Sequence, residues 1–514
     1  MTSSLEGLQF PLHSKTNKAS TSHTGKIILS SALSTIDKEL SVEIQHEKKW
    51  RKHYPKYFKA LVKHGIQSTQ NTLEIAKLGL EKAHQSFDFY RDQNKYKLAD
   101  VMSIQADTLN TFKFSGESDD PSEWYVPYHG KKLQGAALLT QIQTWQDQGI
   151  IELSHADALR KVVAHPEWFD LSDRTMVLFG AASEAGPLTW LSKWKANIVA
   201  VDLQNEHVWD KILNTIQQGN ATLYAPSFEQ LDSSTDISVL KHKLGANLLT
   251  QIPEITQWLL QNPNDLDLAA IAYLDGEKHV RVALAMDAIM QQISQHKTNT
   301  SLMFMCTPTD VYAIPKEVSE ATHKKFKQRS TLHKVLTKGI SALSLKHFFD
   351  PNDDELIQSD NQQQYGIADC LVVEQGPNYA LAKRLQQWRA TLARTEGQVV
   401  SINIAPSTTT HSVVKNPLLK AAFNGATLFD VEAFKPETTN ALMAALWIHD
   451  LQNTKSVAHP NTPLNHPLEL MMSGANHGGL WRVAYLARTA LPFAALYGFA
   501  NEKLPFIKLL STKK

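Results

Sequence analysis

The chain has 514 residues and a formal net charge of +1 at pH 7, a balance that gives no support for nucleic-acid binding. Hydrophobic residues make up 42% and charged residues 20%, a composition typical of a globular protein rather than a disordered one. Two cysteines, Cys306 and Cys370, exclude a disulfide scaffold and fit a reducing, cytoplasmic compartment.

The first part of the sequence predicts no signal peptide, and the chain has no run of 18 apolar residues that would span a membrane. Residues 1–32 are rich in Ser, Thr, Lys and His and predict a mobile tail. Residues 33–165 predict a helical N-terminal region with a basic stretch at 48–63. That stretch is interpreted as a solvated helical face, and the alternative is a basic helix lying on an anionic membrane.

From Thr175 onward, short apolar runs alternate with helical segments. This alternation predicts a Rossmann-type, doubly wound parallel sheet within residues 166–452, an α/β fold. Residues 308–370 predict a polar, helical insertion, and residues 453–514 predict a C-terminal helical extension. The expected strands lie within residues 175–179, 196–203, 222–225, 268–274, 301–307 and 399–405.

A glycine turn, Gly180 to Gly186, follows the first of these strands, and Asp202 ends the second, about 20 residues after Gly180. Glycines let the backbone approach a diphosphate, and the N-terminus of the helix predicted at residues 188–195 supplies amide donors. An acid at the position of Asp202 binds ribose hydroxyls. It favours NAD(H) over NADP(H), because a carboxylate repels the extra phosphate.

Tyr379 and Lys383 lie four residues apart in a predicted helix that starts after Gly376-Pro377. The spacing places both side chains on one helix face. An ammonium group beside a phenol stabilises the phenolate, so the pair suits acid–base chemistry. The alternative is an ordinary amphipathic helix with a surface lysine. The similar pair Tyr312 and Lys316 is rejected because Pro315 interrupts its helix.

Taken together, residues 172–450 resemble the short-chain dehydrogenase/reductase (SDR) family. The order of glycine turn, acid, Tyr-x-x-x-Lys helix and a proline–threonine loop after the sixth strand is similar to the order in that family. The resemblance implies that Tyr379 is the proton donor or acceptor, that Lys383 binds the nicotinamide ribose and lowers the pKa of Tyr379, and that Thr307 replaces the usual serine. It also implies that the following residues contact the cofactor: Gly180, Ala182, Ser183, Gly186, Asp202, Asp275, Gly276, Lys383, Pro406, Thr409 and Thr410.

The chain departs from the family pattern at four points. Glu184 replaces the middle glycine of the turn, Leu274-Asp275-Gly276 replaces the asparagine–alanine–glycine motif, and Ser407 replaces a glycine. A long segment separates Thr307 from Tyr379 where the family has a short loop, and it is expected to fold over the site as a lid.

The sequence therefore predicts an enlarged NAD(P)-dependent oxidoreductase acting on a carbonyl or hydroxyl carbon of a hydrophobic small molecule. The alternative is a binding or scaffold protein that has lost catalysis. A peripheral membrane contact through the basic helices and the C-terminal helix fits either hypothesis. The family resemblance implies a homo-oligomer that assembles through the helix carrying Tyr379 and Lys383. The segment Met471 to Arg482, with His477 between glycines, suits a loop near a ligand or a turn before the last helix.

Overall fold

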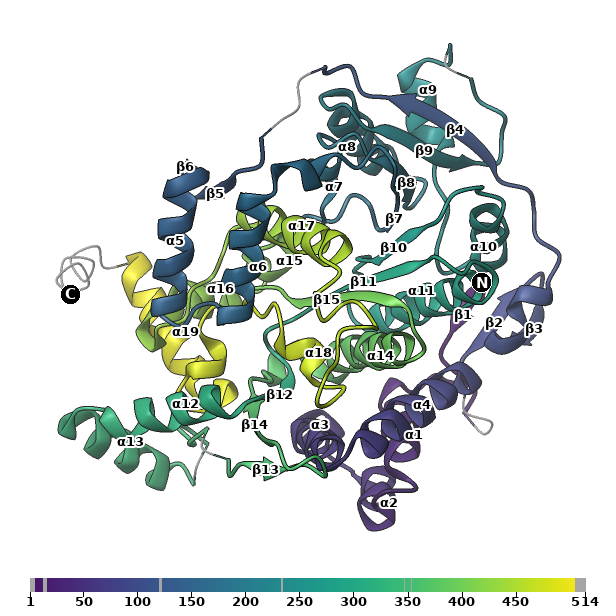
Figure 1. The fold of residues 1–514 in the computed structure, drawn as a ribbon. Helices are drawn as coiled ribbons and strands as arrows, with labels where there is room; N and C mark the ends of the chain where they lie inside the picture. The colour runs from purple at the N-terminus through teal and green to yellow at the C-terminus, as the bar shows by residue number, and fades with distance from the viewer. Residues whose placement is uncertain are drawn as a thin grey trace.

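A computed structural model describes residues 5–12, 16–119, 123–232, 234–345, 347–352 and 354–503. Its centre is a sheet of seven strands in the order β15-β11-β10-β7-β8-β9-β4 (Figure 1). Every neighbouring pair is parallel except β9 and β4. The strands are β4 (Asn110–Ser115), β7 (Thr175–Phe179), β8 (Asn197–Val201), β9 (Thr222–Ser227), β10 (Asp267–Ala270), β11 (Ser301–Cys306) and β15 (Val399–Ile404).

The strand order reverses direction at β7. From there the chain moves outward to β8 and β9 and then returns to build β10, β11 and β15 on the other side. Adjacent strands whose connections leave in opposite directions open a crevice at their carboxyl ends. The Rossmann-type α/β fold predicted from the sequence is therefore confirmed, and the crevice lies between β7 and β10.

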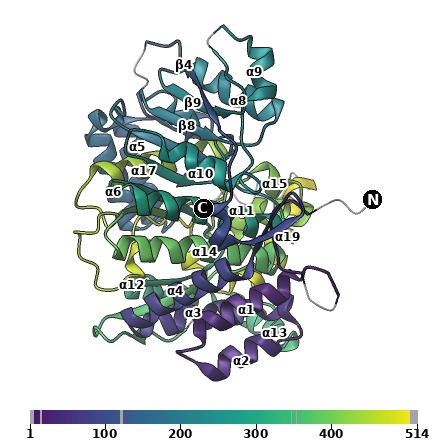
Figure 2. The same ribbon diagram turned by 90° about the vertical axis from the view of Figure 1, so that its right-hand side faces the viewer.

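Helices cover both faces of the sheet because the strands are apolar on both sides. Val177 and Phe179 of β7 belong to one core, and Met176 and Leu178 belong to the other. The first core contains residues of α10 (Ile252–Leu260), α11 (Glu277–His296) and α14 (Gly376–Thr395). The second contains residues of α7 (Leu188–Leu191), α8 (Glu206–Gln217) and α17 (Pro436–Gln452). Figure 1 shows α17 and α10 on opposite sides of the central strands, and Figure 2 shows the same arrangement from the side of α10.

The N-terminal region forms a third layer against α14. It comprises β1 (Gly7–Gln9), α1 (Thr21–Leu33), α2 (Lys38–His46), α3 (Trp50–Gln67), α4 (Thr69–Ser86), β2 (Asp88–Arg91) and β3 (Asn94–Lys97). The predicted mobile tail is wrong for its described part, since Leu8 pairs with Phe89 and Ile28 is fully buried. A Cβ on Gly79 of α4 would lie 2.4 Å from the Trp388 ring of α14. This close packing covers the helix through which the family resemblance implies assembly.

The rest of the N-terminal half adds β5 (Val126–Tyr128), β6 (Lys131–Leu133), α5 (Gly135–Asp147) and α6 (Leu153–Ala164), and α9 (Ile237–Lys243) follows β9. The predicted helical region at 33–165 therefore also contains strands, and β4 joins the central sheet at its edge.

The segment at 308–370 is only partly helical. It forms a small antiparallel sheet, β12-β14-β13, beside two helices. Its elements are β12 (Val311–Pro315), α12 (Lys316–Gln328), α13 (Thr331–Leu343), β13 (Ile357–Gln358) and β14 (Gln364–Asp369). The polar composition of the segment does not predict these strands, because Val311 to Ile314 form only a short apolar run, which is buried.

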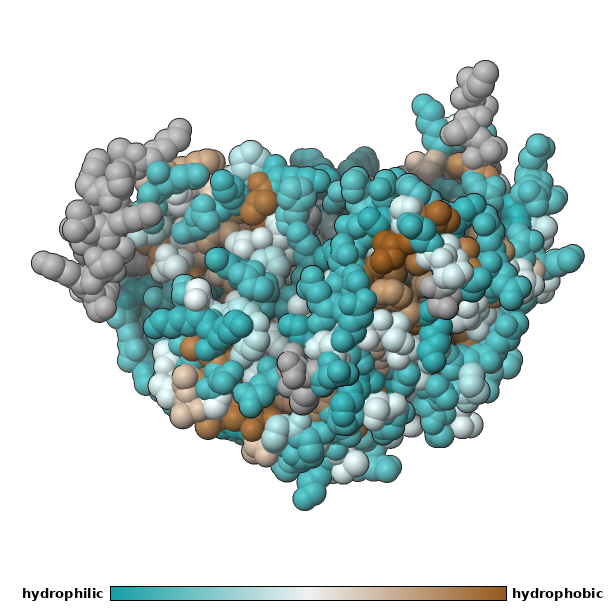
Figure 3. All heavy atoms as spheres, turned by 90° about the horizontal axis from the view of Figure 1, so that it is seen from above, coloured by the Kyte–Doolittle hydropathy of each residue, from teal (hydrophilic) through white to brown (hydrophobic). Residues whose placement is uncertain are grey.

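The C-terminal part consists of short helices after β15 and a longer last helix. They are α15 (His411–Val414), α16 (Pro417–Asn424), α18 (Glu469–Met472) and α19 (Ala487–Lys503). Among the described residues, no helix combines the length and the apolar composition that crossing a bilayer requires. Seen from above, the surface is mostly hydrophilic with separate apolar patches (Figure 3).

Candidate active site

A cavity of about 820 Å³ lies at the carboxyl ends of the parallel strands. Its volume falls within the range of small-molecule and cofactor sites, roughly 300–1,000 Å³. Residues that follow β7, β8, β10, β11 and β15 line it, together with the first turns of α11 and α14. The predicted site residues that line this cavity are Gly180, Ala182, Ser183, Asp202, Gly276, Thr307, Tyr379, Lys383, Pro406 and Thr410.

The glycine turn is held close to the sheet. Gly180 has a φ of 88°, and a Cβ there would lie 2.5 Å from the Cα of Ala272, so the position requires glycine. Asp202 accepts hydrogen bonds from the amides of Ala182 at 2.9 Å and Leu203 at 2.8 Å. Burial raises the pKa of the Asp202 carboxyl, and these two amides oppose the rise. Asp202 thus fixes the shape of the turn while still facing the cavity.

The turn differs from the sequence expectation in the helix that follows it. Residues 188–195 were expected to be helical, but α7 has only four residues, and the chain turns at Lys195 with a φ of 55°. A helix this short contributes little dipole at its N-terminus. Glu184 does not stand over the turn unpaired, because its carboxylate accepts a hydrogen bond from the His411 amide at 2.8 Å. This bond joins the turn to the start of α15.

Tyr379 stands in the first turn of α14. Gly376 begins that helix with a φ of 80°, and Pro377 occupies its first turn, where a missing amide hydrogen costs nothing. Burial raises the pKa of Tyr379 to about 12, and a hydrogen bond with Thr307 opposes this rise. The expectation that Lys383 brings the pKa of Tyr379 down is therefore wrong for this structure, because desolvation is the larger effect.

Lys383 lies one turn further along α14 and faces the end of β11. Its ammonium donates to the carbonyl of Met305 at 2.9 Å and to Oε1 of Gln386 at 3.2 Å. Burial lowers the pKa of Lys383. The helix places both residues of the pair in the cavity wall, as their spacing predicts.

A chain of side-chain hydrogen bonds leads to the phenol of Tyr379. Gln375 donates through Nε2 to Oγ1 of Thr309 at 2.6 Å, and Oγ1 of Thr309 lies 2.9 Å from Oγ1 of Thr307. The Thr309 hydroxyl can donate to Thr307 or accept from it, because it has a second lone pair besides the one that Gln375 uses. The side-chain hydrogen bond between Thr307 and Tyr379 completes the chain. No sequence pattern pointed to Gln375 or Thr309 beyond their closeness to predicted residues.

His279 is a second group that sequence reasoning missed. Its ring stacks on Tyr379 with centroids 5.3 Å apart, and its other neighbour is Tyr273 at 4.8 Å. The side chain is buried in the cavity wall, and neither ring nitrogen has a hydrogen-bond partner among the described residues. Burial, reinforced by the charge of Lys383, lowers the pKa of His279 well below its usual value. The ring is therefore neutral and able to donate one hydrogen bond and accept one.

The mouth of the cavity is formed partly by the N-terminal layer. Thr21, Ser22 and Arg51 line it, whereas none of the described residues between 310 and 372 does. The expected lid from the insertion is therefore wrong for this structure. The insertion packs against α3 and the C-terminal segment instead, because its strands and α12 bury apolar residues there.

Three predicted cofactor residues do not line the cavity: Gly186, Asp275 and Thr409. Asp275 accepts a hydrogen bond from the Tyr273 hydroxyl at 3.1 Å, and Thr409 donates through Oγ1 to the carbonyl of Phe434 at 3.2 Å. Both side chains are directed to neighbours in the fold.

The segment Met471 to Arg482 also lies outside the cavity. His477 and Arg482 both bind Glu152, at 2.8 Å and 2.7 Å. Although burial would raise it, these two partners hold the pKa of Glu152 at about 2. The segment thus attaches the start of α6 to the C-terminal region, and its turn interpretation agrees with this geometry.

Comparison with solved structures shows a remote structural likeness. The crystal structure of the terminal R domain from the myxalamid PKS-NRPS biosynthetic pathway aligns with 60% of this chain and 68% of its own, at 12% identity and a TM-score of 0.29. No family model and no curated protein matches the sequence. A likeness this remote carries no argument about function, so a functional proposal must rest on the geometry of the cavity.

Proposed function

We propose that the protein is an NAD(H)-dependent oxidoreductase that interconverts a carbonyl and an alcohol. The observation that carries the proposal is the phenol of Tyr379, bonded to Thr307 and one helical turn from Lys383, in the same cavity as the glycine turn and Asp202. Acid–base chemistry at a carbonyl needs a positioned proton donor beside a nucleotide site.

The residues present fit a dinucleotide. Each oxygen of Asp202 accepts one amide hydrogen bond and has capacity for a second, which suits ribose hydroxyls. Its carboxylate would disfavour a phosphate at the same place, so NAD(H) is favoured over NADP(H). Lys383 and the residues after β15 would hold the nicotinamide end. When bound, the cofactor would supply or accept the hydride.

Tyr379 would handle the proton. With a pKa of about 12 it keeps its proton near neutral pH, which favours the role of acid at a substrate carbonyl. The hydrogen bond from Thr307 would stabilise the phenolate that remains. Gln375 and Thr309 would hold the Thr307 hydroxyl in place beside the phenol.

Apolar residues of α15 and α16, Val413, Leu419 and Phe423, line the same cavity. They favour a substrate whose carbonyl is attached to an apolar body.

The decisive pair of variants is Tyr379→Phe and Thr307→Ser, tested for NADH oxidation against a panel of apolar aldehydes and ketones. Tyr379→Phe is expected to lose about 10²- to 10⁴-fold in kcat with NADH binding retained. Thr307→Ser keeps the donor and is expected to stay near the wild-type rate. Equal turnover by Tyr379→Phe and wild type would contradict the mechanism.

A second candidate is a ligand-binding protein without catalysis. The bond between Glu184 and His411 and the four-residue α7 favour it, since both alter the part of the fold that receives a diphosphate. This candidate predicts that neither NADH nor NADPH binds to the folded wild-type protein.

A further inference from the structure

Helix α13 turns an apolar face to solvent. Val335, Leu336 and Leu343 share one side of the helix, and Leu345 follows its last turn. Their exposed fractions are 65%, 55%, 90% and 82%. Gly339 and Ala342 lie on the same side and are also exposed. Single exposed leucines are ordinary, but this many on one short segment mark a contact surface.

The side of α13 that carries the buried Thr337 holds the helix to the protein, and Ile340 lies at the border between this side and the exposed one. Ile340 packs into a small aromatic cluster that joins it to α12 and α19, with Phe326, Phe348, Phe349 and Phe493. The exposed leucines are therefore not the result of a helix detached from the fold. One side of α13 is anchored, and the other has no contact within the described chain that would bury it.

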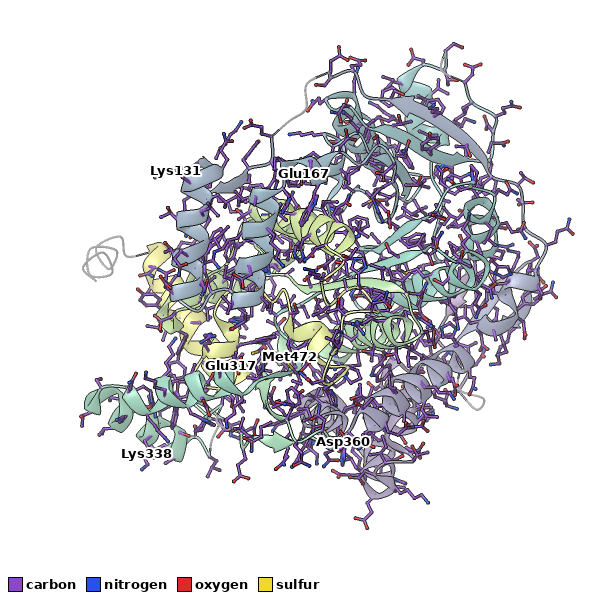
Figure 4. The ribbon with its side chains drawn as sticks, in the orientation of Figure 1. Lys131, Glu167, Glu317, Lys338, Asp360 and Met472 are labelled. Atoms are coloured by element: carbon purple, nitrogen blue, oxygen red, sulfur yellow. The ribbon has the colours of Figure 1, made fainter. Side chains whose placement is uncertain are left out.

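The exposed face lies within a basic segment. Residues 316–346 contain eight Lys and Arg residues but only two acidic residues. Among the described residues, no ion pair joins Lys324, Lys327, Lys334 or Lys338 to an acid, whereas Lys325 pairs with Asp430 at 2.8 Å. Figure 4 shows Lys338 on α13 at the periphery of the molecule. Positive charge thus flanks the apolar side chains.

We propose that α13 and the turn through Leu345 dock on an anionic lipid bilayer. The aliphatic side chains would enter the boundary of the acyl chains, and the lysines would face the phosphate groups. Long lysine side chains suit this arrangement because their stems cover apolar surface while the ammonium stays in water. Helix α3, the basic segment singled out in the sequence, fits less well because its apolar residues Trp50, Tyr54 and Phe58 are buried.

The test is co-sedimentation of the full chain with two kinds of vesicle, phosphatidylcholine alone and phosphatidylcholine mixed with phosphatidylglycerol. The proposal predicts binding to the anionic vesicles that weakens with salt, and much less binding to the neutral ones. Leu336→Glu with Leu343→Glu should reduce binding at least roughly tenfold. Lys334→Glu with Lys338→Glu should reduce it roughly fivefold or more for each charge.

Val42→Glu is the matched control. Val42 is 54% exposed on α2, away from α13, so its variant should bind like wild type. Absence of wild-type binding to anionic vesicles would overturn the proposal, and so would unchanged binding by the leucine variant. A dimer in light scattering that the leucine variant dissociates, without vesicle binding, would assign the face to a second copy of the chain and also overturn it. None of these outcomes depends on nicotinamide binding.

Discussion

Two buried histidines in this molecule, His477 and His279, differ in their hydrogen bonding. His477 lies between the C-terminal region and α6, where Nε2 binds Glu152 at 2.8 Å and Nδ1 accepts from the Gly479 amide at 3.0 Å. His279 lies in the wall of the cavity, stacked on Tyr379, and neither of its nitrogens has a partner among the described residues.

The difference separates a structural role from a role in binding. A buried polar group that is fully hydrogen-bonded stabilises the fold, whereas one left without partners costs about 1–3 kcal/mol. A protein that keeps such a group beside its catalytic candidate is expected to use it on a ligand. Both histidines stand near glycines in the sequence, so the local pattern alone does not distinguish them.

The largest expected effect comes from removing the Glu152 carboxylate, which His477 and Arg482 share. Glu152→Leu leaves His477 and Arg482 without their shared carboxylate, and the free energy of unfolding should fall by about 3–5 kcal/mol. Urea unfolding measures the change. The matched control is Glu43→Gln, which removes the exposed pair with Lys56 and should cost about 1 kcal/mol or less. An equal loss in both variants would contradict the structural role of the cluster.

A smaller effect is expected from acid. Burial lowers the pKa of His155 to about 4, while the unfolded chain takes up that proton near pH 6.5. The stability that the neutral His155 contributes is therefore fully present above about pH 6.5 and is lost as the pH falls toward 4. It should decrease by about 2 kcal/mol between about pH 7 and about pH 5 through this residue. In His155→Gln the decrease in unfolding free energy between about pH 7 and about pH 5 should be smaller by about 2 kcal/mol. An identical decrease in the variant and the wild type would contradict the assignment.

The smallest expected effect is an increase, and not a decrease, in the free energy of unfolding. His279→Phe removes two unpartnered nitrogens and keeps an aromatic ring beside Tyr379, so the apo protein should be stabilised by about 1 kcal/mol. The same variant should lose much of the rise in melting temperature that NADH gives the wild type. Thermal unfolding with and without NADH measures both quantities. His477→Phe is the contrasting variant and should be destabilised; destabilisation of His279→Phe to the same extent would remove the distinction between the two residues.

Much of the fold was predictable from the sequence because the parallel strands are short apolar runs separated by helical segments, the pattern that crossover connections require. The placement of Tyr379 and Lys383 in one wall followed from their spacing. The position of His279 was not predictable, because it depends on how closely the first turns of α11 and α14 approach. The same holds for Gln375 and Thr309, which are 66 residues apart and meet only in the folded chain.

Other errors have different causes. The four-residue α7 was expected to be longer, because the apolar pattern continues past Leu191 while the backbone turns at Lys195. The N-terminal tail looked mobile by composition, yet the few apolar residues it has, such as Leu8 and Ile28, are those that pack. The lid expected from the insertion was inferred from its place in the sequence, which says nothing of the direction in which it folds.

The central claim is that the cavity at the carboxyl edge of the sheet binds NAD(H). The most direct measurement is calorimetric titration of the purified wild-type protein with NADH and NADPH, repeated with Asp202→Ala. The account predicts NADH binding that is tighter than NADPH binding and weakens in Asp202→Ala. Absence of binding by either nucleotide to a folded sample would contradict it and would favour the binding protein without catalysis.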